Sequence, residues 1–315
     1  DGLWSVHLRW IWVEALSTRI HLHPDYKRGA AGGEGGKISS VQAAASHLES
    51  REERVSTAER RSQQQAAALM TKGAAGAAGA GKKTVLITGA SRGLGRALAV
   101  EMARRGHAVV GCARSHDALH SLHADLHPSP SSPSPSPSPH LLTTADVRSD
   151  GSVRELAKLV AESRRVPDII VNNAGAINKN NKIWLVPAEE FDMVVDTNIK
   201  GTTNILRHFL PLMIEKKQGI VVNISSGWGR SAAAEVAPYC ATKWAIEGLT
   251  RSVAKELPPG VAIIALSPGV VNTDMLASCF GSSAALYQTP EAWAPKAATM
   301  ILNLTTEDNG ASLTV

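Results

Sequence analysis

Residues 84–95 read TVLITGASRGLG, a short apolar run followed by a glycine-rich turn. The run Thr84–Thr88 is rich in β-branched residues and predicts a strand, and residues 96–105 then follow with helical spacing up to Gly106. The glycines of the turn permit a tight bend and a close approach of the backbone to phosphate, while the helix start offers N–H groups and a favourable dipole. Strand, turn and helix in this order predict a phosphate-binding turn.

Further short apolar runs follow this first unit, and helical segments separate them. They lie at residues 108–112, 141–145, 168–171, 220–224 and 261–266. Short, mostly apolar strands that alternate with helices are typical of a parallel sheet covered on both faces. The predicted fold class is therefore α/β, a single-domain Rossmann-type doubly wound parallel sheet with helices on both faces.

The composition limits the classes of function. The chain has 315 residues, a net charge of +5 and 43% hydrophobic residues, enough for one ordinary core and an extension. No stretch approaches the roughly 18 apolar residues of a membrane helix. Acidic and basic residues are interspersed, so neither nucleic acid nor membrane is an expected partner. The three cysteines are too few and too scattered for disulfides or a metal site, which favours a reducing, cytoplasmic location and no metal.

Two segments differ from the α/β pattern. Residues 1–82 are interpreted as a disordered or non-native extension, with translation expected to begin at Met70, and residues 83–315 as the domain itself. The segment 127–140 reads HPSPSSPSPSPSPH, which cannot form a helix or an inner strand. It joins a helix to the third strand, at the amino ends of the strands, so a solvated loop far from any ligand is expected.

The charges beside the turn indicate which dinucleotide would bind. An NAD enzyme usually has an acidic residue at the end of the second strand, but here that strand ends Cys112-Ala113-Arg114-Ser115. Arg92 lies within the turn, and two guanidinium groups suit the 2′-phosphate of NADP(H). NADPH/NADP+ is therefore the predicted cofactor, with two ordinary surface arginines as the alternative.

Five motifs in order resemble the short-chain dehydrogenase/reductase family over residues 83–315. They are TGxxxGxG at 88–95, NNAG at 172–175, Asn198 in DTNI, Ser226 13 residues before the YxxxK motif 239–243, and SPGVVNT at 267–273. By this resemblance the catalytic residues are Asn198, Ser226, Tyr239 and Lys243. The implied cofactor-binding residues are Gly89, Ser91, Arg92, Gly93, Leu94, Gly95, Arg114, Asp146, Val147, Asn173, Ala174, Gly175, Tyr239, Lys243, Pro268, Gly269, Val271 and Thr273.

The catalytic residues suit the reduction of a carbonyl group. Lys243 is four residues after Tyr239, on the same helix face, and its charge is expected to lower the phenol pKa from about 10 toward a useful acid strength. Ser226 would donate a hydrogen bond to the carbonyl oxygen, and by resemblance Asn198 would hold a water that relays protons to Lys243. Separately, each has a plainer interpretation: a packed ring, a surface charge, a turn serine and a helix cap.

A closer resemblance is to the plant NADPH-dependent pterin aldehyde reductases within this family. The similar runs are GCARS, INKNNKIW, SSGWGRS, APYCATKWAIEGL and SCFGSSAALYQ. The resemblance implies reduction of pterin-6-aldehyde and dihydropterin-6-aldehyde in folate salvage, along with aromatic and aliphatic aldehydes. It also implies a homodimer paired through residues 187–216 and 238–257.

Three residues are candidates for substrate contact. Trp228 can stack on a flat pterin, and Met275 and Tyr287, together with Phe280, belong to a segment that covers the substrate in the family. The alternative is that these side chains only pack the core. Two other functions stay open: a general aldehyde or ketone reductase with another physiological substrate, and a catalytically silent NADPH-binding regulator.

Overall fold

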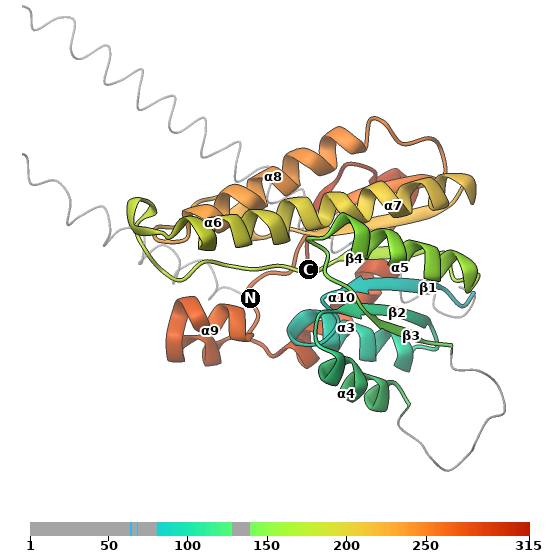
Figure 1. Cartoon of the computed structure of the whole chain (residues 1–315), viewed down its shortest axis with the longest axis horizontal. Helices are drawn as coiled ribbons and strands as arrows, with labels where there is room; N and C mark the ends of the chain where they lie inside the picture. Colours follow the sequence, from blue (N-terminus) through green and yellow to red (C-terminus); the bar gives the residue numbers. More distant parts are fainter. Residues whose placement is uncertain (1–63, 65–67, 69–80, 128–138) are drawn as a thin grey trace, which may run out of the picture. The chain divides into compact units, whose positions relative to one another are not determined.

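The computed structural model describes residues 64, 68, 81–127 and 139–315 (Figure 1). The proposed translation start at Met70, and nearly all of the extension 1–82, lie outside the described residues. So do residues 128–138 of the proline- and serine-rich segment. Of that segment, His127 and His140 are described, directly after helix α4 (His116–Leu126) and directly before strand β3 (Leu141–Thr144).

Seven parallel strands form one sheet in the order β3-β2-β1-β4-β5-β6-β7. The remaining strands are β1 (Thr84–Thr88), β2 (Ala108–Ala113), β4 (Ile169–Asn172), β5 (Gly219–Ile224), β6 (Val261–Ser267) and β7 (Ser312–Thr314). The strand order reverses between β1 and β4, and such a switch point is where doubly wound sheets bind ligands, beyond the carboxyl ends of the strands. The predicted fold class is confirmed.

Helices cover both faces of the sheet because successive strand residues point to opposite sides (Figure 1). In β1, Val85 and Ile87 join one apolar cluster and Leu86 joins the other. The first cluster contains residues of α3 (Gly93–Arg104), α4 and α10 (Pro290–Leu302). The second contains residues of α5 (Asp150–Glu162) and α7 (Gly201–Glu215), and α8 (Ala237–Val253) packs against it through Leu249 and Val253.

Two elements were not predicted from the sequence. Strand β7 is short and largely polar, so it carries little strand signal of its own, and it forms through its pairing with β6 (Ala265 opposite Ser312). The second is a π-helical segment, Asp196–Lys200, between α6 (Ala188–Val195) and α7. A π turn inside a helix often marks a functional site, and this one contains Asn198.

The carboxyl edge of the sheet carries further short elements. They are the 3-10 turns η2 (Ile183–Leu185), η4 (Gly227–Gly229) and η5 (Gly281–Leu286), and helix α9 (Asp274–Phe280), whereas the 3-10 turn η6 (Thr306–Asp308) directly precedes β7. In the part of the chain that the structure describes, no helix is long and apolar enough to cross a membrane.

Candidate active site

The glycine turn between β1 and α3 has the shape expected of a phosphate cradle. Gly89 has φ +65°, and a Cβ there would lie 2.9 Å from Cα of Ala174. A Cβ on Gly95 would collide with the carbonyl oxygen of Gly89. No side chain caps α3 at Arg92, so the first N–H groups of the helix remain available for an anion. These features fit a dinucleotide phosphate.

The two predicted arginines lie at the same edge, after paired strands. Arg92 follows β1 and Arg114 follows β2, and Thr88, the last residue of β1, pairs with Cys112 near the end of β2. The Arg92 side chain is 76% exposed, with its guanidinium 3.7 Å from the Asp274 carboxylate. Arg114 is exposed as well, so both guanidinium groups are open to an incoming phosphate.

The segment after β3 holds the predicted Asp146 and Val147. The guanidinium of Arg148 donates to the Asp146 carboxylate, with Nη2 to Oδ2 at 2.6 Å, and lowers the pKa of Asp146. The charge of Arg114 contributes to the same lowering. Val147 is buried, and its carbonyl oxygen accepts from Asn204 at 2.9 Å.

The segment after β4 is held against the turn and against α8 by two asparagines. Asn173 donates its backbone N–H to the Thr88 hydroxyl at 3.0 Å and its amide to the Thr88 carbonyl at 2.9 Å. Asn198 is 2% exposed; its amide binds both backbone groups of Ala176 and donates to the Thr242 hydroxyl at 2.9 Å. Asn198 lies inside a continuous helix, so the helix-cap alternative is wrong.

Tyr239 and Lys243 are both buried on α8. Burial raises the pKa of Tyr239 to about 12, although a hydrogen bond with Ser226 opposes this rise. Burial also lowers the pKa of Lys243 to about 8, and its ammonium donates to the carbonyl oxygen of Ile224 at 2.8 Å. The expected lowering of the tyrosine pKa by Lys243 is not found: burial raises this pKa, and the opposing contribution comes from Ser226, although Lys243 Nζ lies 5.5 Å from the centre of the phenol ring.

Ser226 begins the turn that follows β5. Its hydroxyl accepts a hydrogen bond from the backbone N–H of Trp228 at 3.1 Å. The Oγ–H remains a donor, and in this structure the side chain is also hydrogen-bonded to Tyr239; donation is the polarity that a carbonyl oxygen requires.

The loop after β6 extends toward the glycine turn. Trp293 donates to the carbonyl oxygen of Pro268 at 3.0 Å, Gly269 has φ +72°, and Val271 is buried. Thr273 caps α9 through its hydroxyl, and its methyl group would lie 3.7 Å from a Cβ on Gly93. The predicted cofactor residues of this loop therefore approach those of the turn.

A pocket of about 200 Å³ opens beside Tyr239. Its lining residues are Asn180, Trp228, Ala233, Ala234, Val236, Cys279 and Phe280. The rings of Trp228 and Phe280 are nearly parallel, at 16° with centroids 6.1 Å apart, and Trp228 packs edge-on against Tyr239. The pocket thus combines two aromatic faces with one amide.

Residues 83–282 match the family model described as short chain dehydrogenase. The chain belongs to the short chain dehydrogenase family. It is 65% identical over 233 residues to the NADPH-dependent pterin aldehyde reductase of Arabidopsis thaliana, covering 74% of this chain and 93% of that protein. It is 33% identical over 195 residues to a 3-oxoacyl-[acyl-carrier-protein] reductase of Staphylococcus epidermidis, covering 61% of this chain and 77% of that protein. A putative short chain dehydrogenase from Pseudomonas syringae matches in structure with a TM-score of 0.67 and 27% identity, covering 74% and 94%.

Within this short chain dehydrogenase, the three predicted substrate residues are placed differently. Trp228 lines the pocket. Tyr287 packs edge-on against Phe280, with centroids 6.3 Å apart, and the methyl group of Met275 would lie 3.9 Å from a Cβ on Gly175. Neither of the last two is among the lining residues.

Phe280, from the segment expected to cover the substrate, lines the pocket, and so do Asn180 and Cys279, which the sequence did not single out as substrate residues. Asn180 lies within the INKNNKIW run, and its amide donates to the carbonyl oxygen of Cys279 at 3.1 Å. This contact joins segments that are distant in the chain, so only the family-like runs around them could have indicated it.

Proposed function

We propose that this chain reduces aldehydes to alcohols with NADPH, and that pterin-6-aldehyde and dihydropterin-6-aldehyde are its main substrates. The observation that carries the proposal is the 65% identity to the Arabidopsis pterin aldehyde reductase across 93% of that protein. The convergence of Ser226, Tyr239 and Lys243 beside an aromatic pocket supports it. Aromatic and aliphatic aldehydes are further proposed substrates.

The glycine turn and its arginines are the proposed NADPH site. The N–H groups at the start of α3 would bind the pyrophosphate, and Arg92 and Arg114 the 2′-phosphate. NADPH, when bound, supplies the hydride that reduces the carbonyl carbon. The remaining requirement is a proton at the carbonyl oxygen, which the protein must supply.

Tyr239 is the proposed proton donor. With a pKa raised to about 12, the phenol is protonated at neutral pH, and an alkoxide is a strong enough base to take its proton. Ser226 would donate a second hydrogen bond to the same oxygen and stabilise its developing charge. Lys243, with a pKa lowered to about 8, can then return a proton to the tyrosinate near neutral pH. Asn198 would keep the β4 loop and α8 in register beside it.

The aromatic pocket favours a flat ring. Trp228 and Phe280 line the pocket with aromatic surface against which a pterin can pack, and the amide of Asn180 offers hydrogen-bonding groups at the same site. A simple aliphatic aldehyde would use neither feature. The pocket therefore supports a pterin aldehyde over a short alkyl aldehyde.

The proposed setting is folate salvage in the cytoplasm, by a homodimer. The three cysteines fit a reducing compartment; the structure has all of them as free thiols. The expected dimer helices α6, α7 and α8 carry exposed apolar side chains, among them Phe191, Ile214 and Trp244. Size-exclusion chromatography with light scattering tests the dimer.

An aldehyde panel tests the function. Initial rates with pterin-6-aldehyde, benzaldehyde and hexanal are measured with NADPH and with NADH. We expect the highest kcat/KM for pterin-6-aldehyde with NADPH. Equal or higher kcat/KM for the simple aldehydes would support a general aldehyde reductase instead, and NADPH binding without oxidation would support a silent regulator.

A further inference from the structure

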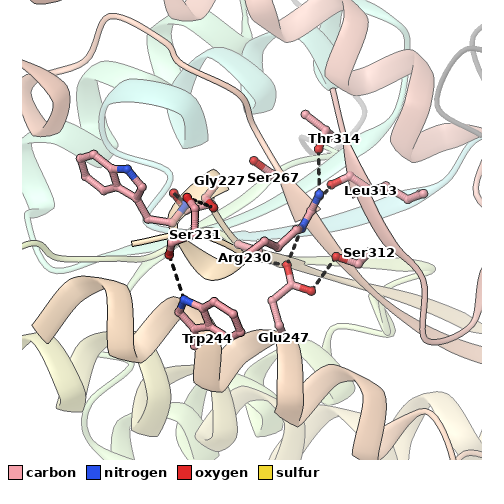
Figure 2. A network of polar contacts seen from close by, with 12 residues as sticks. Gly227, Arg230, Ser231, Trp244, Glu247, Ser267, Ser312, Leu313 and Thr314 are labelled. Atoms are coloured by element: carbon pink, nitrogen blue, oxygen red, sulfur yellow. Dashed lines mark hydrogen bonds and ion pairs between the residues drawn. The ribbon is translucent and has the colours of Figure 1, made fainter. Parts of the chain in front are cut away.

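A buried carboxylate lies on α8 directly beyond the proposed proton donor. Glu247 is four residues after Lys243 and eight after Tyr239, so the three side chains share one face of the helix. The Glu247 side chain is only 4% exposed. Its Oε1 accepts from the Ser225 hydroxyl at 2.7 Å. The same oxygen accepts from Arg230 Nε at 3.2 Å (Figure 2).

Strand β7 completes this network. The Ser312 hydroxyl donates to Oε2 of Glu247 at 2.6 Å. Arg230 donates from Nη1 to the Thr314 hydroxyl at 3.1 Å and from Nη2 to the carbonyl oxygen of Leu313 at 2.7 Å (Figure 2). The guanidinium therefore joins the segment after β5 to both α8 and the last strand of the sheet.

The residues so held flank the catalytic serine. Ser225 directly precedes Ser226, and Arg230 directly follows η4. We name residues 225–231 the serine loop. Two further observations show that this loop packs on α8. Gly229 approaches the helix so closely that a Cβ there would lie 2.9 Å from the carbonyl oxygen of Lys243. In addition, Trp244 Nε1 donates to the carbonyl oxygen of Ser231 at 2.9 Å. The loop therefore packs against one turn of α8, at Lys243, Trp244 and Glu247.

This arrangement sets where Ser226 lies relative to Tyr239, because one is on the loop and the other on the helix. A displacement of about 1 Å in a reacting group can cost on the order of 100-fold in rate. A buried ion pair adds little net stability over apolar residues of the same size, since desolvation offsets the attraction. Its value here lies in the fixed directions of its hydrogen bonds.

We propose that Glu247 and Arg230 are positioning residues for the reduction, and that they align Ser226, and with it Trp228, against Tyr239 by tying the serine loop to α8 and β7. The proposal rests on the proposed function, in which Ser226 and Tyr239 act on the carbonyl oxygen. It extends that site to a carboxylate, a guanidinium and a strand that do not touch the substrate.

The first test is Glu247→Gln, with Glu101→Gln as the matched control. Glu101 is another buried carboxylate held by arginines, but on α3. We expect Glu247→Gln to lower kcat about tenfold with KM for NADPH changed less than about twofold, and Glu101→Gln to leave kcat within about twofold. Wild-type kcat in Glu247→Gln, or equal losses in both variants, would overturn the proposal.

The second test keeps the proposal falsifiable if Glu247→Gln does not fold. Ser225→Ala removes one hydrogen bond to Glu247 and leaves the ion pair intact, and it should lower kcat about threefold. Combined with Ser226→Ala, it should lower the residual kcat less than about 1.5-fold, because a positioning effect disappears with the group that is positioned. An equal fold-loss with and without Ser226, or no loss in Ser225→Ala, would contradict the proposal.

The two levels of the argument fail differently. If none of the aldehydes tested supports NADPH oxidation by the wild-type protein, the proposed function is wrong, and the positioning role is wrong with it. If the wild type is active and Ser226→Ala is impaired, but Ser225→Ala and Glu247→Gln match the wild type, only the positioning role is wrong.

Discussion

Glu101 and Glu247 are both buried carboxylates held by arginines, yet they lie toward opposite ends of the sheet. Glu101 accepts from Arg104 and Arg105 near the end of α3, just before β2 begins. Arg105 in turn binds the Thr299 hydroxyl and the carbonyl oxygen of Pro295, which joins α3 to α10. Glu247 instead joins α8 to the serine loop after β5.

The difference shows that location decides what a buried ion pair does. The two networks use the same groups at similar distances. The amino ends of the strands carry no proposed site residue, so the Glu101 network can only hold helices together. The carboxyl ends carry the glycine turn, Ser226 and the pocket, so the Glu247 network acts on groups that contact ligands. The predictions below test this division between the two ends.

The largest effect is expected from Tyr239→Phe at the carboxyl edge. The substitution removes the proton donor but leaves the protein's contacts with the phosphates of NADPH intact. The kcat should therefore fall about 10³-fold, while the Kd for NADPH changes less than about twofold. Stopped-flow turnover and NADPH fluorescence titration measure the two. Retention of more than about a tenth of the wild-type kcat would refute the assignment.

The pH dependence of reduction comes next in size. Burial lowers the pKa of Lys243 to about 8, so above this pH the lysine no longer carries the proton that Tyr239 needs back. The kcat for pterin-6-aldehyde should be level from pH 6 to 7.5 and fall about tenfold per pH unit above 8. A rate that stays level to pH 10 would contradict the role given to Lys243.

Arg92→Ala tests the cofactor preference at the same edge. Losing one guanidinium should raise KM for NADPH about 30-fold and leave KM for NADH within about twofold, because only NADPH carries the 2′-phosphate. Lys158→Ala, which removes an exposed charge on α5, is the control and should change neither value. An equal increase in KM for NADPH and for NADH would show that Arg92 does not bind the 2′-phosphate.

Trp228→Ala should have a smaller and selective effect. Losing an aromatic face should raise KM for pterin-6-aldehyde about tenfold and KM for hexanal less than about twofold. Trp184→Ala serves as the control, since that ring is 74% exposed and outside the lining of the pocket. An equal rise for both aldehydes would count against stacking.

The smallest effect on turnover is expected at the other end, from Glu101→Gln. Hydrogen bonds from Arg104 and Arg105 lower the pKa of Glu101 from its usual 4.5, so its stabilising effect is present above pH 4.5 and is lost as pH falls below it. The substitution should reduce the free energy of unfolding at pH 7 by about 1–2 kcal/mol, and the difference from wild type should shrink toward pH 3. Urea unfolding at both pH values measures the difference in the free energy of unfolding between variant and wild type. A difference that is the same at both pH values would show that it does not come from the ionised Glu101 carboxylate.

Several elements could be predicted because their signals are local. Strand β1 and the turn after it depend on neighbouring residues, and the pair Tyr239 and Lys243 depends only on the helical spacing of four. Strand β7 could not be predicted in the same way, because a three-residue segment with a single apolar residue, Leu313, forms a strand only when β6 offers its edge. The π segment at Asn198 was also missed, since the contacts of Asn198 with Ala176 and Thr242 depend on the tertiary structure.

The sequence by itself determined the fold class, the family and the identity of the proposed catalytic groups, because these depend on periodicity and on motifs of a few residues. Only the tertiary structure decided which side chains line the pocket, and that burial leaves Tyr239 with a raised pKa. It also brought together Ser225, Glu247 and Ser312, which are far apart in the chain. Such contacts have no local pattern, because they form only when α8 and β7 pack beside the end of β5.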